Sequence, residues 1–350
     1  MNGKKNIMVA PLNWGIGHAT RCIPIIKQLK KNNFNVIIMS SGRSLNLLIK
    51  EFPDENFIKL EDYNVTYSNF LPMQINIFLQ IPKIIFGIYT ENRKLKSIIK
   101  DYEIDGIISD NRYGLYSNKV PSVFITHQIK IQTPFLKELV KKINCYFINK
   151  FSICWIPDFK KNKIAGELSD TENTKIRHSY IGPLSRLIKK EPKDNIEILA
   201  IVSGPEPQRT IFENILLKEL KKINKKSLLL QGKPEKNYSE KFNNLIVKSH
   251  LKAEELNQVM IDAKTIICRA GYSTIMDLIA LDKHATLVPT PGQTEQEYLA
   301  DFLSKKGLFQ FQKQDTLNMN LASNYSSVNQ KTKIPKQKNE WGKLFEIFKN

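Results

Sequence analysis

The sequence predicts an α/β protein with two domains, each built on a doubly wound parallel sheet. The chain has 350 residues, about twice the length of an ordinary domain. Short apolar segments that end in polar residues alternate with amphipathic segments of helical length, which is typical of parallel strands joined by helices. This alternation lapses in a polar, proline-containing run near residues 185–196 and then starts again, which indicates a linker between two such domains.

The first half begins with a βαβ unit. A buried strand is expected at Ile7–Pro11, a helix at Ala19–Lys31 and a second strand at Val36–Met39. Two further apolar segments, Asp105–Ser109 and Pro121–Thr126, end in polar residues and are expected to be strands of the same sheet. Because these strands are separated by helices, the sheet is predicted to be parallel.

The second half repeats this organisation. Its expected strands are Ile198–Val202, Ser227–Leu230, Leu245–Val247, Thr265–Cys268 and Ala285–Val288. We therefore expect Rossmann-like domains over residues 1–188 and 189–325, facing a cleft. A polar segment and a C-terminal helix, at 326–350, are then free to pack back on the first domain. Ligands of such sheets bind at the carboxyl ends of the strands, so functional residues are expected there.

Composition and charge exclude several classes of protein. Hydrophobic residues make up 41% of the chain and charged residues 25%, which excludes a disordered or collagen-like chain. The four cysteines form no C-x-x-C pair, so neither a zinc ribbon nor a redox pair is predicted. The net charge of +19 favours a polyanionic partner, whether nucleic acid, an anionic membrane or a phosphorylated substrate. Nucleic acid is disfavoured because no recognition module for it is visible.

The N-terminal segment contains neither a signal peptide nor an apolar stretch that could span a bilayer, so we expect a cytoplasmic protein. Two segments are both apolar and basic: Phe70–Phe86 and Pro134–Trp155. Amphipathic helices of this kind lie readily on an anionic leaflet, which would place the protein peripherally on the inner face of the membrane. The alternative, that both segments simply pack on the sheet, is equally open.

The first strand leads into a glycine turn with a histidine at the start of a helix. This turn contains Gly15, Gly17, His18 and Thr20, and its backbone N–H groups are suited to an anionic group. His18 is a candidate base or phosphate donor, although a histidine at this position is also compatible with an ordinary, partly buried residue. Asp110 and His127 follow two neighbouring strands, and Asp110 is the second candidate base.

A similar turn follows a strand of the second half, where Arg269, Gly271, Ser273 and Thr274 precede Asp277. Phosphate at the helix N-terminus and Asp277 one turn later would fit the diphosphate and ribose of a nucleotide.

The next strand ends in a loop of hydrogen-bonding side chains: Gln293, Thr294, Glu295, Gln296 and Glu297. These side chains point to ligand binding at the same edge. The alternative is a polar turn in which Thr294 caps the next helix and Glu297 completes a capping box.

Three common motifs are missing. A dinucleotide fingerprint would need a third glycine near Thr20 and an acidic residue where Ser40–Arg43 stand, so NAD binding is disfavoured. The Walker pattern is absent as well. No Asp-x-Asp triplet occurs of the kind that holds Mg²⁺ at a diphosphate, so neither a metal nor another cofactor is expected.

Taken together, these segments resemble the glycosyltransferase B fold. They are most similar to the glycosyltransferase family 28 group, which includes the N-acetylglucosaminyltransferase of peptidoglycan lipid intermediates and the diacylglycerol galactosyltransferases. The family's first loop is a glycine turn ending in histidine on the acceptor side, as Gly15, Gly17 and His18 are. Its donor signature is similar to Arg269 through Asp277, with aspartate in place of the usual glutamate.

Other parts of the family pattern match less closely. Ser203 and Gly204 match its pyrophosphate loop, and His250 and Leu251 fall near the place where uracil would stack. The loop from Pro289 to Gln296 is similar to the family's sugar-binding loop. That loop departs from the family at Glu297 and Ala300, so the donor sugar is not implied.

The resemblance implies a hexosyltransferase that moves a sugar from a nucleotide sugar, most simply a UDP-sugar, to a lipid-linked or cell-envelope glycan acceptor. It also implies metal-independent, inverting chemistry with His18 or Asp110 as base. Two alternatives stay open. Gly17, His18, Thr20 and Arg21 also resemble the UDP-sugar hydrolase of pseudaminic acid biosynthesis. The chain could also be a non-catalytic module that binds a nucleotide sugar or a lipid head group.

Overall fold

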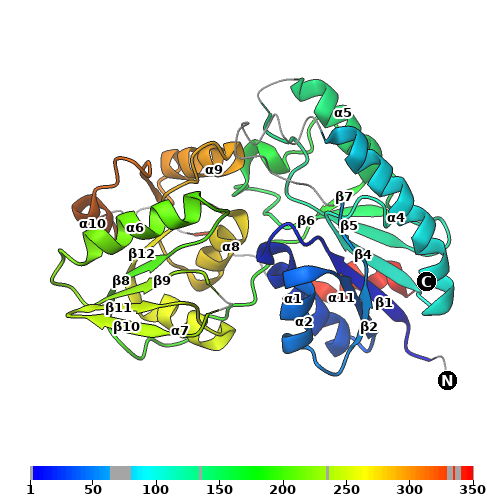
Figure 1. Ribbon diagram of the computed structural model, residues 1–350. Coiled ribbons are helices and arrows are strands. Elements are labelled where there is room, and N and C mark those ends of the chain that lie inside the picture. The colour runs from blue at the N-terminus through cyan, green and yellow to red at the C-terminus, as the bar shows by residue number, and fades with distance from the viewer. Residues whose placement is uncertain are drawn as a thin grey trace. The chain divides into compact units, whose positions relative to one another are not determined.

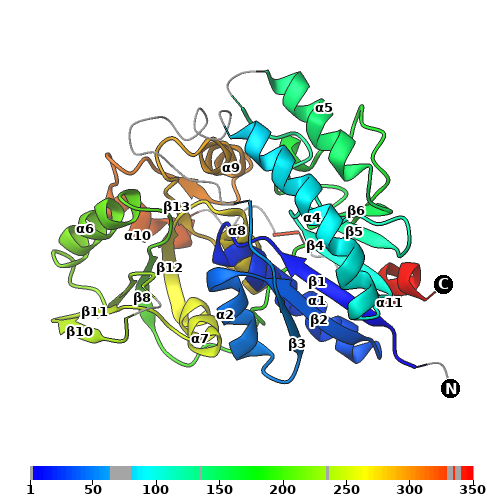
Figure 2. The ribbon, with the colours of Figure 1, turned by 45° about the vertical axis from the view of Figure 1, so that its right-hand side comes forward.

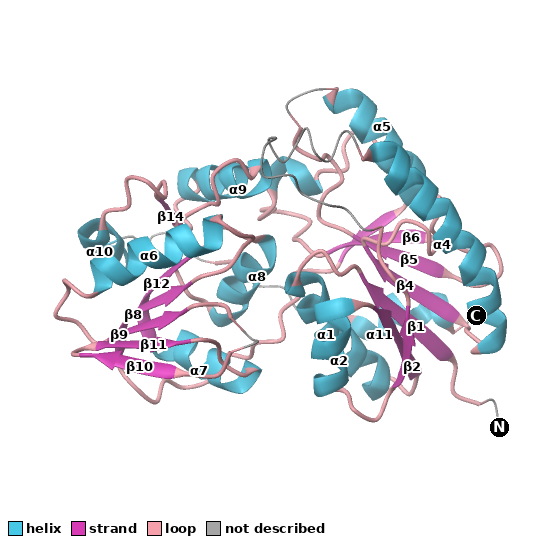
Figure 3. Ribbon diagram, viewed as in Figure 1, coloured by secondary structure: helices cyan, strands magenta, loops and turns pink. Residues whose placement is uncertain are grey.

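The computed structural model describes residues 3–63, 80–133, 136–233, 236–328, 334–335 and 340–349 (Figures 1 and 2). It divides into two compact units, one of residues 1–186 with 337–350 and the other of residues 187–336. Each unit has a mostly parallel sheet with helices against it (Figure 3). The predicted α/β class with two doubly wound sheets is thus confirmed.

The first unit has a seven-stranded parallel sheet in the order β3-β2-β1-β4-β5-β6-β7. Its strands are β1 (Asn6–Pro11), β2 (Asn35–Ser40), β3 (Asn56–Lys59), β4 (Gly106–Asp110), β5 (Ser122–Ile125), β6 (Ile153–Ile156) and β7 (His178–Tyr180). Its helices are α1 (Ile16–Lys31), α2 (Gly42–Glu51), α4 (Ile81–Asp101), α5 (Lys137–Ile148), α11 (Trp341–Leu344) and two 3₁₀ turns at Gly166–Ser169 and Phe345–Phe348. The strand order changes direction between β1 and β4, and ligands of such sheets bind at this switch point.

The second unit has its own seven-stranded sheet, in the order β10-β11-β9-β8-β12-β13-β14. Its strands are β8 (Ile196–Ile201), β9 (Ser227–Leu230), β10 (Ser239–Phe242), β11 (Leu245–Lys248), β12 (Ala263–Cys268), β13 (Thr286–Leu287) and β14 (Gln310–Phe311). Its helices are α6 (Gln208–Leu220), α7 (Ala253–Asp262), α8 (Tyr272–Leu281), α9 (Thr294–Lys305) and α10 (Met319–Val328). Among the described strands of this sheet, β10 alone is antiparallel to its neighbour, and the switch point lies between β8 and β12.

Alternation along the strands builds a core on each face of the first sheet. Ile7 and Val9 of β1 point to the face covered by α1, whereas Met8 and Ala10 pack with Leu95 of α4 on the other face. Strands buried on both faces are apolar throughout, which explains why the central strands were predictable from short apolar runs.

The prediction that Pro134–Trp155 forms one amphipathic helical segment was wrong. Residues 134–135 lie outside the described part, and the rest divides into helix α5 and strand β6. Trp155 belongs to that strand and is buried in the core. Of Phe70–Phe86, residues 70–79 lie outside the described part, and the last residues begin α4. No helix in the described ranges is long and apolar enough to cross a bilayer.

The last turn of the chain packs in the core of the first unit. Phe345 and Phe348 are fully buried there, with ring centroids 5.9 and 6.4 Å from that of Phe34. A Cβ on Gly106 would lie 2.4 Å from the Phe348 ring, so β4 and this turn fit closely. The C-terminal turn therefore closes one face of the first sheet.

Phe348→Ala is expected to lower the free energy of unfolding by about 3–5 kcal/mol, because the variant leaves a cavity in this core. Urea unfolding measures the loss. The matched control is Glu346→Ala in the same turn, where the side chain is exposed and about 0.5 kcal/mol or less is expected. Equal, small losses in both variants would show that the turn does not stabilise the unit.

Candidate active site

The loops after β1 and β4 meet at the switch point of the first sheet. Pro11 and Asp110, the last residues of these strands, are paired in the sheet, and the Leu12 N–H donates to the Asp110 carbonyl at 3.0 Å. Helix α1 starts at Ile16, three residues earlier than expected, so His18 lies in its first turn. The sheet thus brings His18 next to Asp110 although 92 positions separate them.

His18 and Asp110 form a hydrogen-bonded pair. The His18 Nδ1 lies 2.8 Å from Asp110 Oδ1, and the carboxylate is fully buried. Arg21 Nη2, which can only donate, also lies 3.0 Å from this Nδ1 but donates to Asp110 Oδ1. Because the ionised carboxylate only accepts hydrogen bonds, its contact with Nδ1 favours an imidazole protonated at that nitrogen. The lone pair is then on Nε2, for which the described residues provide no hydrogen-bond partner, and the imidazole is 19% exposed. This nitrogen is available to take a proton from a ligand.

Arg21, one turn after His18, holds the same carboxylate. Its Nε and Nη2 donate to the two oxygens of Asp110, and its side chain is 4% exposed. Burial alone would raise the pKa of Asp110, but Arg21 and then His18 outweigh it and hold this pKa well below its usual range. Asp110 is therefore a weak base, and its carboxylate is held in contact with both Arg21 and His18.

Other predicted residues of the first unit surround this pair. His127 is buried after β5, with Nδ1 3.4 Å from Arg21 Nη1. The Thr20 hydroxyl donates to the Gly17 carbonyl at 3.0 Å. Gly15 is exposed at the N-cap of α1, and no heavy atom would lie within 4 Å of an added Cβ. The structure thus brings these residues to one edge, with open space at Gly15.

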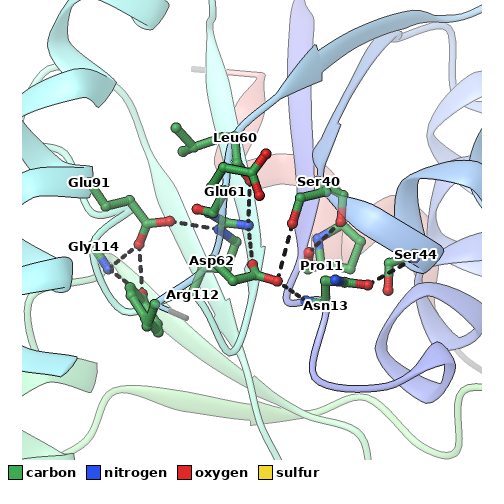
Figure 4. Close-up of polar contacts among 12 residues, drawn as sticks. Pro11, Asn13, Ser40, Ser44, Leu60, Glu61, Asp62, Glu91, Arg112 and Gly114 are labelled. Carbon is green, nitrogen blue, oxygen red and sulfur yellow. Dashed lines mark hydrogen bonds and ion pairs between the residues drawn. The ribbon is translucent and has the colours of Figure 1, made fainter. Parts of the chain in front are cut away.

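A buried ionic network lies beside the same loop (Figure 4). The Arg112 guanidinium, fully buried after β4, donates to Glu91 of α4 at 2.6 Å and to Asp62 at 2.7 Å. Burial raises the pKa of Asp62 although Arg112 opposes the shift. Sequence reasoning missed this network and the role of Arg21. The one available signal was the spacing of three residues between His18 and Arg21, which places both on one helix face.

In the second unit, three helices begin at the carboxyl edge of adjacent strands. Helices α6, α8 and α9 follow β8, β12 and β13, which are neighbours in the sheet. Their first N–H groups and positive dipole ends make this edge suitable for an anion such as a diphosphate. Ser203 and Gly204 are exposed in the first of these loops, and Gly204 has a φ of 109° that favours glycine.

Arg269 ties these three loops together rather than facing solvent. It is 1% exposed and donates to the carbonyls of Gln208, Val288 and Pro289 at 2.9–3.2 Å and to the Gln314 side chain at 2.6 Å. Its guanidinium carbon lies 4.0 Å from the Phe212 ring centroid. Burial lowers the pKa of Arg269 to about 10, so the side chain stays charged at neutral pH. Its contacts assign it to positioning the loops.

The remaining predicted residues lie on the same edge. Gly271 is the N-cap of α8, Ser273 and Thr274 lie in its first turn, and Asp277 is half-buried in its second turn. The alternative, in which Thr294 caps the next helix and Glu297 completes a capping box, was wrong. Gln293 is the N-cap of α9, and Glu297 accepts from the Gly292 N–H at 2.9 Å. Gln296 accepts from the Thr290 N–H at 2.9 Å, and Thr294 and Glu295 begin α9.

His250 and Leu251 lie farther along the edge. They follow β11, and β9 separates that strand from β8. His250 and Leu251 are therefore about two strand spacings, or about 10 Å, from the loop after β8, the first of the loops suited to a diphosphate.

Within the described ranges, no group of three or more His, Cys, Asp or Glu side chains is arranged to hold a metal ion.

Residues 199–346 match the glycosyltransferase family 28 C-terminal domain. A protein of Acetivibrio thermocellus named UDP-N-acetylglucosamine–N-acetylmuramyl-(pentapeptide) pyrophosphoryl-undecaprenol N-acetylglucosamine transferase is 25% identical over 317 residues, covering 83% of this chain and 80% of the relative.

Solved structures of glycosyltransferases share the fold of this chain. MurG of Acinetobacter baumannii aligns with a TM-score of 0.54 at 16% identity, over 92% of this chain and 93% of its own. The kitacinnamycin glycosyltransferase aligns with a TM-score of 0.64 at 12% identity, over 94% and 92%. The chain is a glycosyltransferase of the glycosyltransferase B fold, similar to family 28.

Proposed function

We propose that this glycosyltransferase transfers a sugar from a UDP-sugar to a lipid-linked or cell-envelope glycan acceptor, with inversion and without a metal ion. The observation that carries the proposal is the buried Asp110–His18 pair, fixed by Arg21, at the switch point of the first sheet. The relatives support a UDP-linked donor and a lipid-linked acceptor, since the name of the Acetivibrio protein contains both.

In this mechanism His18 Nε2 takes the proton of an acceptor hydroxyl. The acceptor oxygen bonds to the anomeric carbon as the bond from that carbon to the diphosphate oxygen breaks, and UDP leaves. A single displacement of this kind inverts the anomeric carbon. The negative charge that develops on UDP is offset by the N-terminal N–H groups of α6, α8 and α9.

A test of the function follows UDP release from several UDP-sugars, with and without a membrane lipid extract. The proposal expects release that depends on the extract and a product with inverted configuration. Release of UDP and free sugar without any acceptor would instead favour a UDP-sugar hydrolase. Binding of UDP without turnover would favour a non-catalytic module.

Asp277→Ala is expected to weaken UDP binding by about 1.5–3 kcal/mol, because the variant loses the charged carboxylate that would accept hydrogen bonds from the ribose hydroxyls. Isothermal titration with UDP measures the change. Asp301→Ala on the neighbouring helix α9, where the exposed Asp301 pairs with the exposed Lys305, is the matched control. Unchanged UDP affinity in a folded Asp277 variant would remove Asp277 from the donor site.

We also propose that the protein is cytoplasmic and binds peripherally to the inner face of the membrane through α4 and α5. Phe86, Leu139 and Tyr146 on these helices are 74%, 50% and 54% exposed. Lys137 and Lys142 are exposed on α5, and Lys141 is half-buried there. An apolar surface with lysines around it is suited to an anionic leaflet, with about 1 kcal/mol for each lysine near the surface.

Charge reversal of Lys137, Lys141 and Lys142 to glutamate is expected to detach the protein from vesicles that contain anionic lipid. Flotation at low and high salt measures this, because salt screens the attraction. Reversal of Lys218, Lys221 and Lys222 at the end of α6 is the matched control, with the same change in net charge. Equal flotation of both variants would contradict a membrane surface at α5.

A further inference from the structure

The loop that precedes the His18 turn is fixed from two sides at Asn13. The Asn13 N–H donates to Asp62 Oδ2 at 3.1 Å, and the Asn13 side-chain oxygen accepts from the Ser44 N–H, in the first turn of α2, at 3.0 Å (Figure 4). The Asn13 amide also packs against Gly42, where an added Cβ would lie 2.5 Å from Asn13 Nδ2. The backbone therefore has little freedom just before Trp14.

The groups that hold Asn13 are themselves held by buried charges. Asp62 accepts hydrogen bonds from Ser41 Oγ at 3.2 Å and from Arg112. Arg112 also donates to Glu91, and Glu91 in turn accepts from the Tyr63 hydroxyl at 2.6 Å. Buried ion pairs are often no more stable than well-packed apolar groups of the same volume. Stability alone thus gives a weak reason for this network, whereas fixing the loop at the edge of the site gives a specific one.

Trp14 is the residue that this fixed loop presents. Its side chain is 44% exposed, in a loop where the neighbouring residues Leu12 and Asn13 are buried or half-buried. Gly15 leaves open space beside it, and the His18 N–H lies 3.4 Å from the Gly15 carbonyl. A segment closed in this way spans about 7 Å, so the Trp14 Cα lies within about 11 Å of the His18 Cα.

We infer that Trp14 binds the sugar ring of the acceptor by stacking, and that Asp62 and Arg112 are positioning residues that fix Trp14 through Asn13. The inference rests on the proposed function, in which His18 takes a proton from an acceptor hydroxyl. A rigid indole offers a broad apolar face that fits the C–H face of a pyranose, and little side-chain entropy is lost when it binds.

The test uses the full chain with UDP-glucose, UDP-galactose and UDP-N-acetylglucosamine as donors. Methyl pyranosides and a membrane lipid extract are the acceptor probes. Trp14→Ala is expected to raise the acceptor KM about 3- to 10-fold while kcat and the Kd for UDP stay unchanged, and Trp14→Phe is expected to restore most of the affinity. Tyr102→Ala, which removes another exposed aromatic ring, is the matched control and is expected to change none of these values.

The positioning role is tested by a double-mutant cycle. Asp62→Ala is expected to raise the acceptor KM as Trp14→Ala does, and the double variant is expected to raise it no further, because both changes remove one contact. Asp62→Asn keeps an oxygen for the Asn13 N–H and is expected to restore the KM in part. Independent, multiplicative effects of the two changes would overturn the positioning role.

An unchanged acceptor KM in Trp14→Ala, with normal UDP release, would overturn the inference and leave the proposed function intact. If no UDP-sugar turns over, the proposed function fails and the fluorescence of Trp14 decides the inference. Trp155 and Trp341 are present in both proteins, so the difference between the native chain and Trp14→Phe isolates the Trp14 signal. Protection of that signal from acrylamide by methyl pyranosides supports the inference, and no protection overturns it.

Discussion

Replacing His18 by alanine is expected to lower kcat by about 10²–10⁴-fold, the range for losing a general base. The Kd for UDP is expected to stay unchanged, because the His18–Asp110 pair belongs to the first unit and the predicted donor loops belong to the second. Rates of UDP release at saturating donor, together with titration of UDP, separate the two quantities.

Asp110→Asn is the informative companion variant. The amide keeps the size of the side chain but removes the charge that favours the Nδ1–H form of His18. A loss of kcat similar to that of His18→Ala is therefore expected, without an additive effect in the double variant. Normal turnover of His18→Ala with an inactive Asp110→Asn would mean that the base is misassigned. Normal turnover of both would refute catalysis at this edge of the sheet.

The sequence was sufficient to predict the central strands and the residues that follow them. β1 is buried on both faces from Ile7 to Pro11, and β8 from Ile198 to Ala200, and both strands are apolar there. Edge strands such as β3 and β7 are short and carry polar residues, so their local sequences resemble loops. Trp155 was assigned to a helix because its strand follows α5 after a gap of only four residues, and the apolar pattern runs through both.

The partners of the site residues could not be predicted in the same way. Asp62, Glu91 and Arg112 are charged, and single charged residues in a sequence indicate an exposed surface. Their burial depends on contacts between residues 21–50 positions apart. Arg21 and Asp110 are 89 positions apart and meet only because β1 and β4 are neighbours at the switch point. Such pairings follow from topology, which local patterns do not encode.

The second large effect is expected in stability. Arg21→Met leaves the buried Asp110 carboxylate without its strongest partner, and the loss of one partner of a buried pair costs about 3–5 kcal/mol. Urea unfolding at pH 7 measures the loss. Arg21→Lys keeps a positive charge but not the two-point contact, so its loss is expected to be smaller. Equal stability of the native chain and Arg21→Met would show that Arg21 does not stabilise Asp110.

The loss caused by Arg21→Met is expected to depend on pH in a definite direction. In the native chain the pKa of Asp110 lies below its unfolded value, so its contribution is complete above about pH 4 and is lost as the pH falls below that. Without Arg21, burial opposes only the remaining contact with His18, and we expect it to raise the pKa of Asp110 above the unfolded value. The free energy of unfolding of Arg21→Met is then lowered most at neutral pH, where the buried carboxyl is charged, and rises as the carboxyl is protonated. The difference in free energy of unfolding between the native chain and Arg21→Met is therefore expected to become smaller from pH 7 to pH 4. A gap that stays constant over this range would show that Arg21 stabilises the unit by packing and not through the charge of Asp110.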